Sequence, residues 1–160
     1  AKADGAPLLV HRNSRTVRDS VQALLYYSNN YIANQVFLAV GAKVEGAPAS
    51  LEKSVRVAKA FVAAHPALAG IEMSEGSGIS YDNRATAPAL AAALAMFAPN
   101  KDLLRRKHDV PSKTGTLKVT KSVAGYLDTK DHGTVRFVVS LDGGGDQRRW
   151  DVVKALQKGL

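Results

Sequence analysis

The 160-residue sequence contains no cysteine, few aromatic residues and no long apolar run. Without cysteine the chain has no disulfides, no thiol nucleophile and no thiolate metal site. The longest stretch free of charged or strongly polar residues, 87–98, is much shorter than the roughly 20 residues that a membrane-spanning helix needs. We therefore expect no transmembrane segment.

Acidic residues are outnumbered, since 22 Lys and Arg against 14 Asp and Glu give a net charge of +8 at pH 7. Such a balance suits an anionic partner. However, Arg12, Arg15 and Arg18 lie far along the chain from the basic run 105–107, and neither group has the interleaved aromatics of a nucleic-acid platform. We expect a solvated basic surface and no nucleic-acid partner. The length and the 46% hydrophobic content predict one globular domain, residues 1–160.

The first half of the chain has the 3.6-residue spacing of amphipathic helices. We expect a short strand over residues 7–11 and then a helix capped by Asn13 or Ser14. A second helix is expected from about Ile32 to a stop at Gly41, because glycine often follows the last turn. A third helix should open after Ser50 and end at 65–66, His-Pro. These three helices predict a helical layer.

The second half changes to a period of two after Pro111. Before it, residues 70–83 are rich in Gly and Ser and predict a loop, and 86–97 predict a buried Ala/Leu helix. The runs 114–119, 122–129 and 134–141 are rich in β-formers and predict a meander of three antiparallel strands. A last helix from Gln147, with Trp150 and Val153 in its apolar stripe, is expected to lie across the sheet.

Two short motifs combine residue types that suit acyl-transfer chemistry. Ser28-Asn29-Asn30 lies between two expected helices, where an irregular backbone can aim Ser28 and Asn30 into one cleft. Residues 113–116, Lys-Thr-Gly-Thr, are expected to start the first strand, with a positive charge, two hydroxyls and a glycine that lets a ligand approach. Each motif alone is equally compatible with a helix cap or a strand-leading lysine.

Together, and in this order, the motifs resemble those of the penicillin-binding serine acyl-transferases. The chain is most similar to the carboxy-terminal part of D-alanyl-D-alanine carboxypeptidases/endopeptidases of the class C, low-molecular-weight penicillin-binding type, peptidase family S13. The runs in register are 27–33 (Tyr-Ser-Asn-Asn-Tyr-Ile-Ala), 75–80 (Glu-Gly-Ser-Gly-Ile-Ser), 83–84 (Asn-Arg), 113–117 (Lys-Thr-Gly-Thr-Leu) and 124–127 (Ala-Gly-Tyr-Leu). The resemblance implies an α/β (α+β) fold of the serine β-lactamase/transpeptidase type, with an antiparallel sheet flanked by helices.

One motif of that family is out of place. Its members carry a Ser-x-x-Lys motif, which supplies the nucleophile, before the Ser-x-Asn motif. Here the only Ser-x-x-Lys is 50–53, which follows Ser28, and Ser50 reads better as a helix N-cap. We therefore expect residues 1–160 to be the carboxy-terminal portion of the catalytic domain, without its front strands and nucleophile helix, and to be inactive alone.

The resemblance implies cleavage of the D-Ala-D-Ala end of peptidoglycan stem peptides through an acyl-enzyme, with β-lactams reacting at the same serine. Ser28 would relay a proton to the leaving nitrogen, and Asn30 would hold the acyl part of the substrate.

The same resemblance assigns roles to the second motif. Lys113 would give the cleft positive charge and, with the hydroxyls of Thr114 and Thr116, would bind the terminal carboxylate. The Thr116 N–H would be one oxyanion-hole donor. Gly115 would keep the strand open to the substrate.

The other candidate residues predict no further chemistry. His11, His65, His108 and His132 are scattered without partners at ligand spacing, so we expect neither a metal nor a cofactor. Ser77 lies between glycines but lacks the Gly-x-Ser-x-Gly pattern of a nucleophile elbow, and is expected to be a packed loop residue beside the cleft.

The expected partners are a stem peptide ending in D-Ala-D-Ala, β-lactams and the amino-terminal segment of the same protein, in the periplasm or cell envelope of a bacterium. Two alternatives stay open. The first alternative is a non-catalytic relative that binds peptidoglycan. The second is a basic module that binds an acidic polymer and carries the motifs by coincidence.

Overall fold

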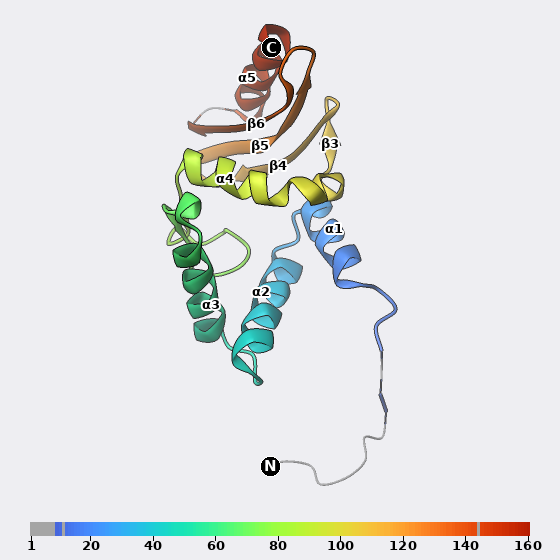
Figure 1. The fold of residues 1–160 in the computed structure, drawn as a ribbon, viewed down its shortest axis with the longest axis vertical. Coiled ribbons are helices and arrows are strands. Elements are labelled where there is room, and N and C mark those ends of the chain that lie inside the picture. The colour runs from blue at the N-terminus through green and yellow to red at the C-terminus, as the bar shows by residue number, and fades with distance from the viewer. Residues whose placement is uncertain (1–8, 11, 144) are drawn as a thin grey trace.

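The computed structural model describes residues 9–10, 12–143 and 145–160. Its α-helices are α1 (Val17–Tyr27), α2 (Asn30–Glu45), α3 (Leu51–Ala64), α4 (Ala87–Phe97) and α5 (Asp146–Gly159), with 3-10 helices η1 (Pro66–Leu68) and η2 (Ala98–Leu103). Its strands are β1 (Ile71–Glu72), β2 (Arg84–Ala85), β3 (Arg106–Lys107), β4 (Val110–Thr116), β5 (Thr120–Thr129) and β6 (Gly133–Asp142). Helices α1–α3 lie on one side of α4, and the sheet lies on the other (Figure 1).

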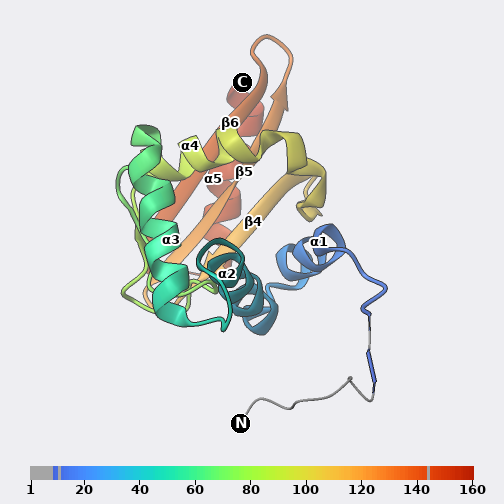
Figure 2. The same ribbon diagram turned by 60° about the horizontal axis from the view of Figure 1, so that its bottom comes forward.

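The main sheet has the order β3-β4-β5-β6 and is antiparallel throughout. Helix α4 crosses one face of this sheet and α5 lies on the other, as Figure 2 makes clear. The fold is therefore the expected mixed α+β class, with antiparallel strands flanked by helices. Two elements were not anticipated: the short edge strand β3, and a separate two-stranded ribbon of β1 and β2.

The core lies between the sheet and α5. Trp150 and Val153 of α5 are 1% and 0% exposed, and they pack with Val123, Leu127 and Phe137 of the sheet. Side chains of this size each stabilise the fold by about 1.5–3 kcal/mol when fully buried. The apolar stripe predicted for the last helix is confirmed, and it fixes α5 under the strands that carry the second motif.

The predicted start of the chain needs correction. Thr16, rather than Asn13 or Ser14, caps α1, because its hydroxyl accepts from the Asp19 N–H while the Asp19 carboxylate accepts from the Thr16 N–H. Asn13 instead accepts a hydrogen bond from the Arg15 N–H. Of the strand predicted over 7–11, residues 9 and 10 form no strand, and residues 7, 8 and 11 lie outside the described residues.

The second helix does not stop at Gly41. Helix α2 runs to Glu45, and Gly41 is buried inside it. A side chain at this position would place its Cβ only 2.3 Å from the Ser54 hydroxyl oxygen of α3. Glycine is here a packing residue that lets two helices approach closely, so the cap signal in the sequence was misleading.

The remaining elements follow their sequence signals, with shifted ends, except that α4 was predicted to be buried and is mostly half-buried or exposed. Ser50 caps α3 by accepting from the Lys53 N–H, and Thr86 caps α4, whose Ala89 is its one fully buried residue. Strand β4 begins at Val110 rather than 114, since Pro111 pairs only with a two-residue edge strand and proline is tolerated there. The Lys-Thr-Gly-Thr motif consequently ends β4 instead of starting it.

Candidate active site

The two sequence motifs line one cleft of about 1110 Å³. Ser28 and Asn30 reach it from the α1–α2 junction, and residues 113–116 reach it from the end of β4. The loop 73–83 forms a third wall with Ser77, Ile79 and other residues. The juxtaposition expected for the two motifs is therefore present, with both on the same cleft.

The α1–α2 junction turns sharply at Ser28. This residue has left-handed backbone angles, with φ 54° and ψ 49°, and its N–H bonds to the Leu24 carbonyl. Asn29 then caps α2 by accepting from the Ile32 N–H. Left-handed angles cost a non-glycine residue about 1–2 kcal/mol, so Ser28 occupies a strained position of the kind found at functional sites. Asn30 begins α2 and lines the cleft. Within the described residues its side-chain amide has no hydrogen-bond partner.

Lys113 connects the two motifs. Its ammonium nitrogen donates to the Ser28 hydroxyl oxygen, 85 residues away in sequence, and to the Thr114 carbonyl at 2.8 Å. An ammonium group can only donate, so Ser28 accepts, and its own hydroxyl proton remains free for another acceptor. Burial, and secondly the positive charge of Arg149, lower the pKa of Lys113.

The end of β4 presents backbone groups to the cleft. In the part of the chain that the structure describes, no strand pairs with residues 113–116 on the side opposite β5. The Ser112 N–H points to that side, where it donates to the Arg105 carbonyl. Because the direction of N–H groups repeats every two residues along a strand, the N–H groups of Thr114 and Thr116 point to the same open edge. This edge can receive an extended ligand.

Glycine at position 115 is required by the neighbouring strand. A Cβ there would lie 2.5 Å from the Ser122 hydroxyl oxygen of β5. Any side chain would push the two strands apart or displace Ser122, so Gly115 keeps the end of β4 flat beside the cleft.

The loop wall is built around Glu75, whose role the sequence analysis missed. Its carboxylate accepts from the N–H and hydroxyl of Ser77, at 2.7 and 2.5 Å, and from the Gly78 N–H at 2.7 Å. Ile79 and Asn83 donate to it as well. Partial burial favours the protonated form, but the hydrogen bonds from Ser77, Ser80 and Asn83 outweigh it and lower the pKa of Glu75 to about 2. An acid before Gly-Ser-Gly is the only sequence signal for this arrangement.

The same loop is fixed to α2. The Gly76 N–H donates to the Asn34 side-chain oxygen at 2.8 Å, and a Cβ on Gly76 would lie 2.5 Å from Phe37 Cβ. The loop thus packs directly on the helix that begins with Asn30. Ser77 donates to Glu75 and lines the cleft, as expected for a packed loop residue.

Arg149 is a second residue that sequence reasoning missed. It comes from α5, is 4% exposed, and its Nη1 lies 2.8 Å from the Gly115 carbonyl and 3.1 Å from the Thr116 hydroxyl oxygen. The periodicity of α5 was read for its apolar residues, and an arginine beside tryptophan gave no signal of burial. The charge of Arg149 therefore lies directly behind the Lys-Thr-Gly-Thr motif.

The alternative candidates have structural roles or none. Ser50 is an N-cap, and Lys53 donates to the carbonyls of Gly46 and Pro48, so this Ser-x-x-Lys is a helix start outside the cleft. Among the described residues no three His, Asp or Glu side chains gather as a metal site. No helix in the described ranges has the length and apolarity to cross a bilayer.

Comparison with known proteins identifies the family. The model of the D-Ala-D-Ala carboxypeptidase 3 (S13) family matches residues 1–111. The chain belongs to this family. The match includes Ser28 and Asn30 and ends just before the Lys-Thr-Gly-Thr motif. The family expected from the sequence is confirmed.

Solved structures share the fold of this S13 family member. Penicillin binding protein 4 of Haemophilus influenzae matches with a TM-score of 0.71 at 21% identity, over 87% of this chain and 39% of that one. Its complex with a β-lactam matches with a TM-score of 0.68 at 23% identity, over 88% and 40%. A predatory peptidoglycan endopeptidase of Bdellovibrio bacteriovorus matches with a TM-score of 0.58 at 17% identity, over 89% and 41%. The chain thus spans about 40% of their length. No curated protein matches.

Proposed function

We propose that the cleft binds the D-Ala-D-Ala end of a peptidoglycan stem peptide, as part of a serine carboxypeptidase or endopeptidase that reacts through an acyl-enzyme and also binds β-lactams. The observation that carries this proposal is the hydrogen bond from Lys113 to Ser28, which unites two motifs 85 residues apart in one cleft. Membership of the S13 family supports a peptidase that acts on peptidoglycan. The substrate places the protein in the periplasm or cell envelope.

Ser28 serves as the proton relay in this proposal. Because the Lys113 ammonium donates to the Ser28 oxygen, the Ser28 proton is directed away from the lysine and toward the cleft. When the peptide bond breaks, that proton passes to the leaving nitrogen of the terminal D-Ala. Ser28 takes a proton back from the hydroxyl of the nucleophilic serine that attacks the peptide. The amide of Asn30 holds the acyl part of the peptide.

The end of β4 binds the other end of the scissile unit. The terminal carboxylate of the peptide is attracted by Lys113 and accepts from the hydroxyls of Thr114 and Thr116. The Thr116 N–H, at the open edge of β4, donates to the carbonyl oxygen on which negative charge develops. Gly115 has no side chain that could hinder a peptide lying alongside the strand.

The nucleophile does not come from the Ser-x-x-Lys at 50–53. Ser50 caps α3 and does not line the cleft. Residues 1–160 therefore bind the peptide without cleaving it, and acylation requires a serine supplied from outside these residues.

The proposal is tested by binding of N-acetyl-D-Ala-D-Ala to residues 1–160, followed by NMR. We expect Lys113→Ala to weaken binding about tenfold or more, because a charge-assisted hydrogen bond contributes about 1.5–3 kcal/mol. Lys118→Ala is the matched control. Lys118 is exposed in the β4–β5 turn, and its substitution removes the same charge.

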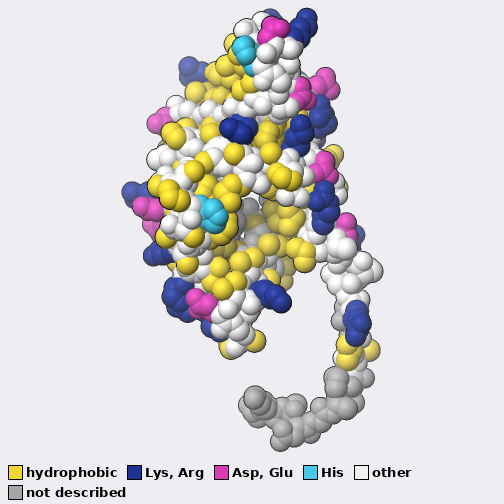
Figure 3. Space-filling view, viewed as in Figure 1, with side chains coloured by type: hydrophobic (Ala, Val, Ile, Leu, Met, Phe, Trp, Pro, Cys, Tyr) yellow, Lys and Arg dark blue, Asp and Glu magenta, His cyan; other side chains and the backbone are white. Residues whose placement is uncertain are grey.

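Equal loss of binding in both variants contradicts the proposal. Displacement of the bound peptide by a polyanion such as polyglutamate, at low salt but not at high salt, also contradicts the proposal. Such a result favours a basic module that binds an acidic polymer. Figure 3 argues against that module for the face it displays, because Lys and Arg are spread around this face with Asp and Glu between them.

A further inference from the structure

The positive charge of Arg149 is buried, and its partners within the protein neutralise it only in part. Its side chain is 5% exposed, and the nearest carboxylate, Asp146, lies 3.5 Å from Nη2 and is 64% exposed. The Nε has no hydrogen-bond partner among the described residues. With only this mostly exposed carboxylate beside it among the described residues, the guanidinium keeps a positive field at the end of β4.

The guanidinium determines where the Thr116 hydroxyl can point its proton. Nη1 lies within hydrogen-bond distance of three acceptors, the Thr116 hydroxyl oxygen and the carbonyls of Gly115 and Ser122. A guanidinium only donates, so Thr116 accepts from it and retains its own proton. Within the described residues this hydroxyl donates to no acceptor, and Thr116 is exposed on the cleft. Its proton is therefore available to a ligand.

Arg149 and Lys113 add two positive charges to the same end of β4. In the described ranges no carboxylate forms an ion pair with Lys113. The charge of Arg149 also acts on Lys113, whose pKa it lowers together with the larger effect of burial. Two like charges in one partly buried place repel each other, and an anion between them relieves the repulsion.

We propose that Arg149 is a positioning residue for the carboxylate of the bound peptide: it fixes the Thr116 hydroxyl as a donor and places a second positive charge behind the strand. This inference rests on the proposed function. The peptide carboxylate binds Thr116 and Lys113 directly, and Arg149 acts through Thr116 and through its charge. α5 is then part of the recognition machinery as well as of the core.

The test compares two probes on residues 1–160 by NMR titration: N-acetyl-D-Ala-D-Ala and the same dipeptide with a carboxamide end. We expect Arg149→Gln to weaken binding of the carboxylate probe about tenfold, and to weaken the carboxamide probe much less, because that probe has an acceptor oxygen but no negative charge. In a Thr116→Val background the loss caused by Arg149→Gln should shrink to about twofold, because the hydroxyl through which Arg149 acts is gone.

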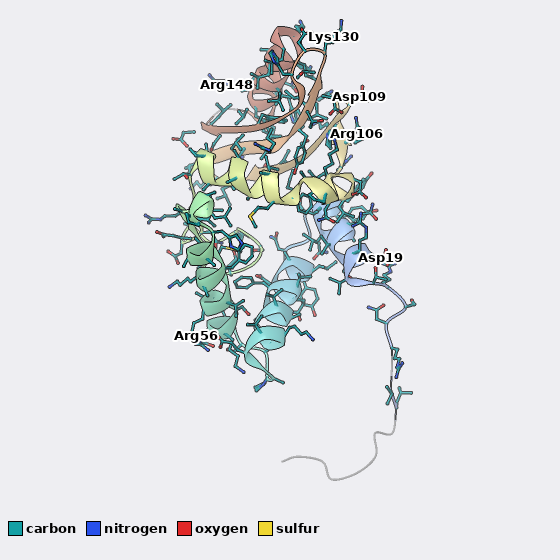
Figure 4. All side chains as sticks on the ribbon, in the orientation of Figure 1. Asp19, Arg56, Arg106, Asp109, Lys130 and Arg148 are labelled. Atoms are coloured by element: carbon teal, nitrogen blue, oxygen red, sulfur yellow. The ribbon has the colours of Figure 1, made fainter. Side chains whose placement is uncertain are left out.

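Arg148→Gln is the control. Arg148 is exposed on the same helix, and its substitution removes the same charge (Figure 4). Should Arg149→Gln fail to fold, Arg149→Lys keeps the charge without the planar fork, and it should still weaken the carboxylate probe more than the carboxamide probe. Equal effects on both probes, or an undiminished loss in the Thr116→Val background, overturn the inference. Absence of any binding by the wild-type chain overturns the proposed function itself, and the inference with it.

Discussion

Replacing Glu75 by glutamine should loosen the loop wall of the cleft in a pH-dependent way. The carboxylate accepts hydrogen bonds from several loop groups, whereas glutamine offers a single acceptor oxygen. A carboxyl whose pKa falls from 4.5 to about 2 on folding gains at most about 3 kcal/mol of stability at neutral pH. The loop is partly open to water, and screening reduces this gain to about 1–2 kcal/mol.

The sign of the pH dependence follows from the direction of the shift. The folded pKa of Glu75 is depressed, so its contribution is complete above about pH 4.5 and is lost as the pH falls toward 2. Urea unfolding of wild type and Glu75→Gln should therefore differ by about 1–2 kcal/mol at pH 7 and by about half of that or less at pH 3. Trp150, the single tryptophan, is buried in the core and reports unfolding by fluorescence.

Glu72→Gln is the control. Glu72 lies in β1 at the base of the same loop, is exposed, and accepts no side-chain hydrogen bond from the described residues. It should change the free energy of unfolding little at either pH. A difference between wild type and Glu75→Gln that is as large at pH 3 as at pH 7 would refute the reasoning, because it would arise from packing and not from the charge. Amide exchange at residues 77–79 should accelerate in Glu75→Gln alone.

Three further outcomes are expected. Penicillin should add no mass to residues 1–160, and an adduct on Ser50 would contradict its assignment as a helix cap. Ser28→Gly should unfold with a free energy about 1 kcal/mol higher than Ser28→Ala, because both variants lose the hydroxyl that Lys113 contacts and only glycine relieves the left-handed backbone, and both should weaken peptide binding in the NMR titration. Gly41→Ala should lower the melting temperature, since overpacking against the Ser54 backbone costs about 1–3 kcal/mol, more than the helix propensity gained.

Local signals in the sequence predicted the elements whose ends are set by local chemistry. Ser50 and Thr86 accept from the N–H three residues on, and this contact needs nothing beyond one turn of helix. Gly41 was misread because its reason is Ser54, on another helix. A glycine that lets two helices approach and a glycine that ends a helix look the same in one sequence.

The residues of the candidate site also fall into those that the sequence could predict and those that it could not. The Ser-x-Asn and Lys-Thr-Gly-Thr motifs could be placed near each other through the resemblance of the whole chain to a family, and the cleft contains both. Glu75 and Arg149 could not be found, because their importance lies in hydrogen bonds to backbone groups, which any sequence supplies. Side chains that act on the backbone have no partner residue type to search for.

The hydrogen bond between Ser28 and Lys113 closes a loop of 85 residues. Chain entropy opposes such a closure by about 4 kcal/mol, which exceeds what one charge-assisted hydrogen bond contributes. The bond therefore cannot hold the two parts together by its own strength and depends on the packing of α4 against β5 and β6, which joins the helices to the sheet that contains β4. The cleft therefore depends on both parts at once, and a substitution that destabilises either the helices or the sheet is expected to remove it.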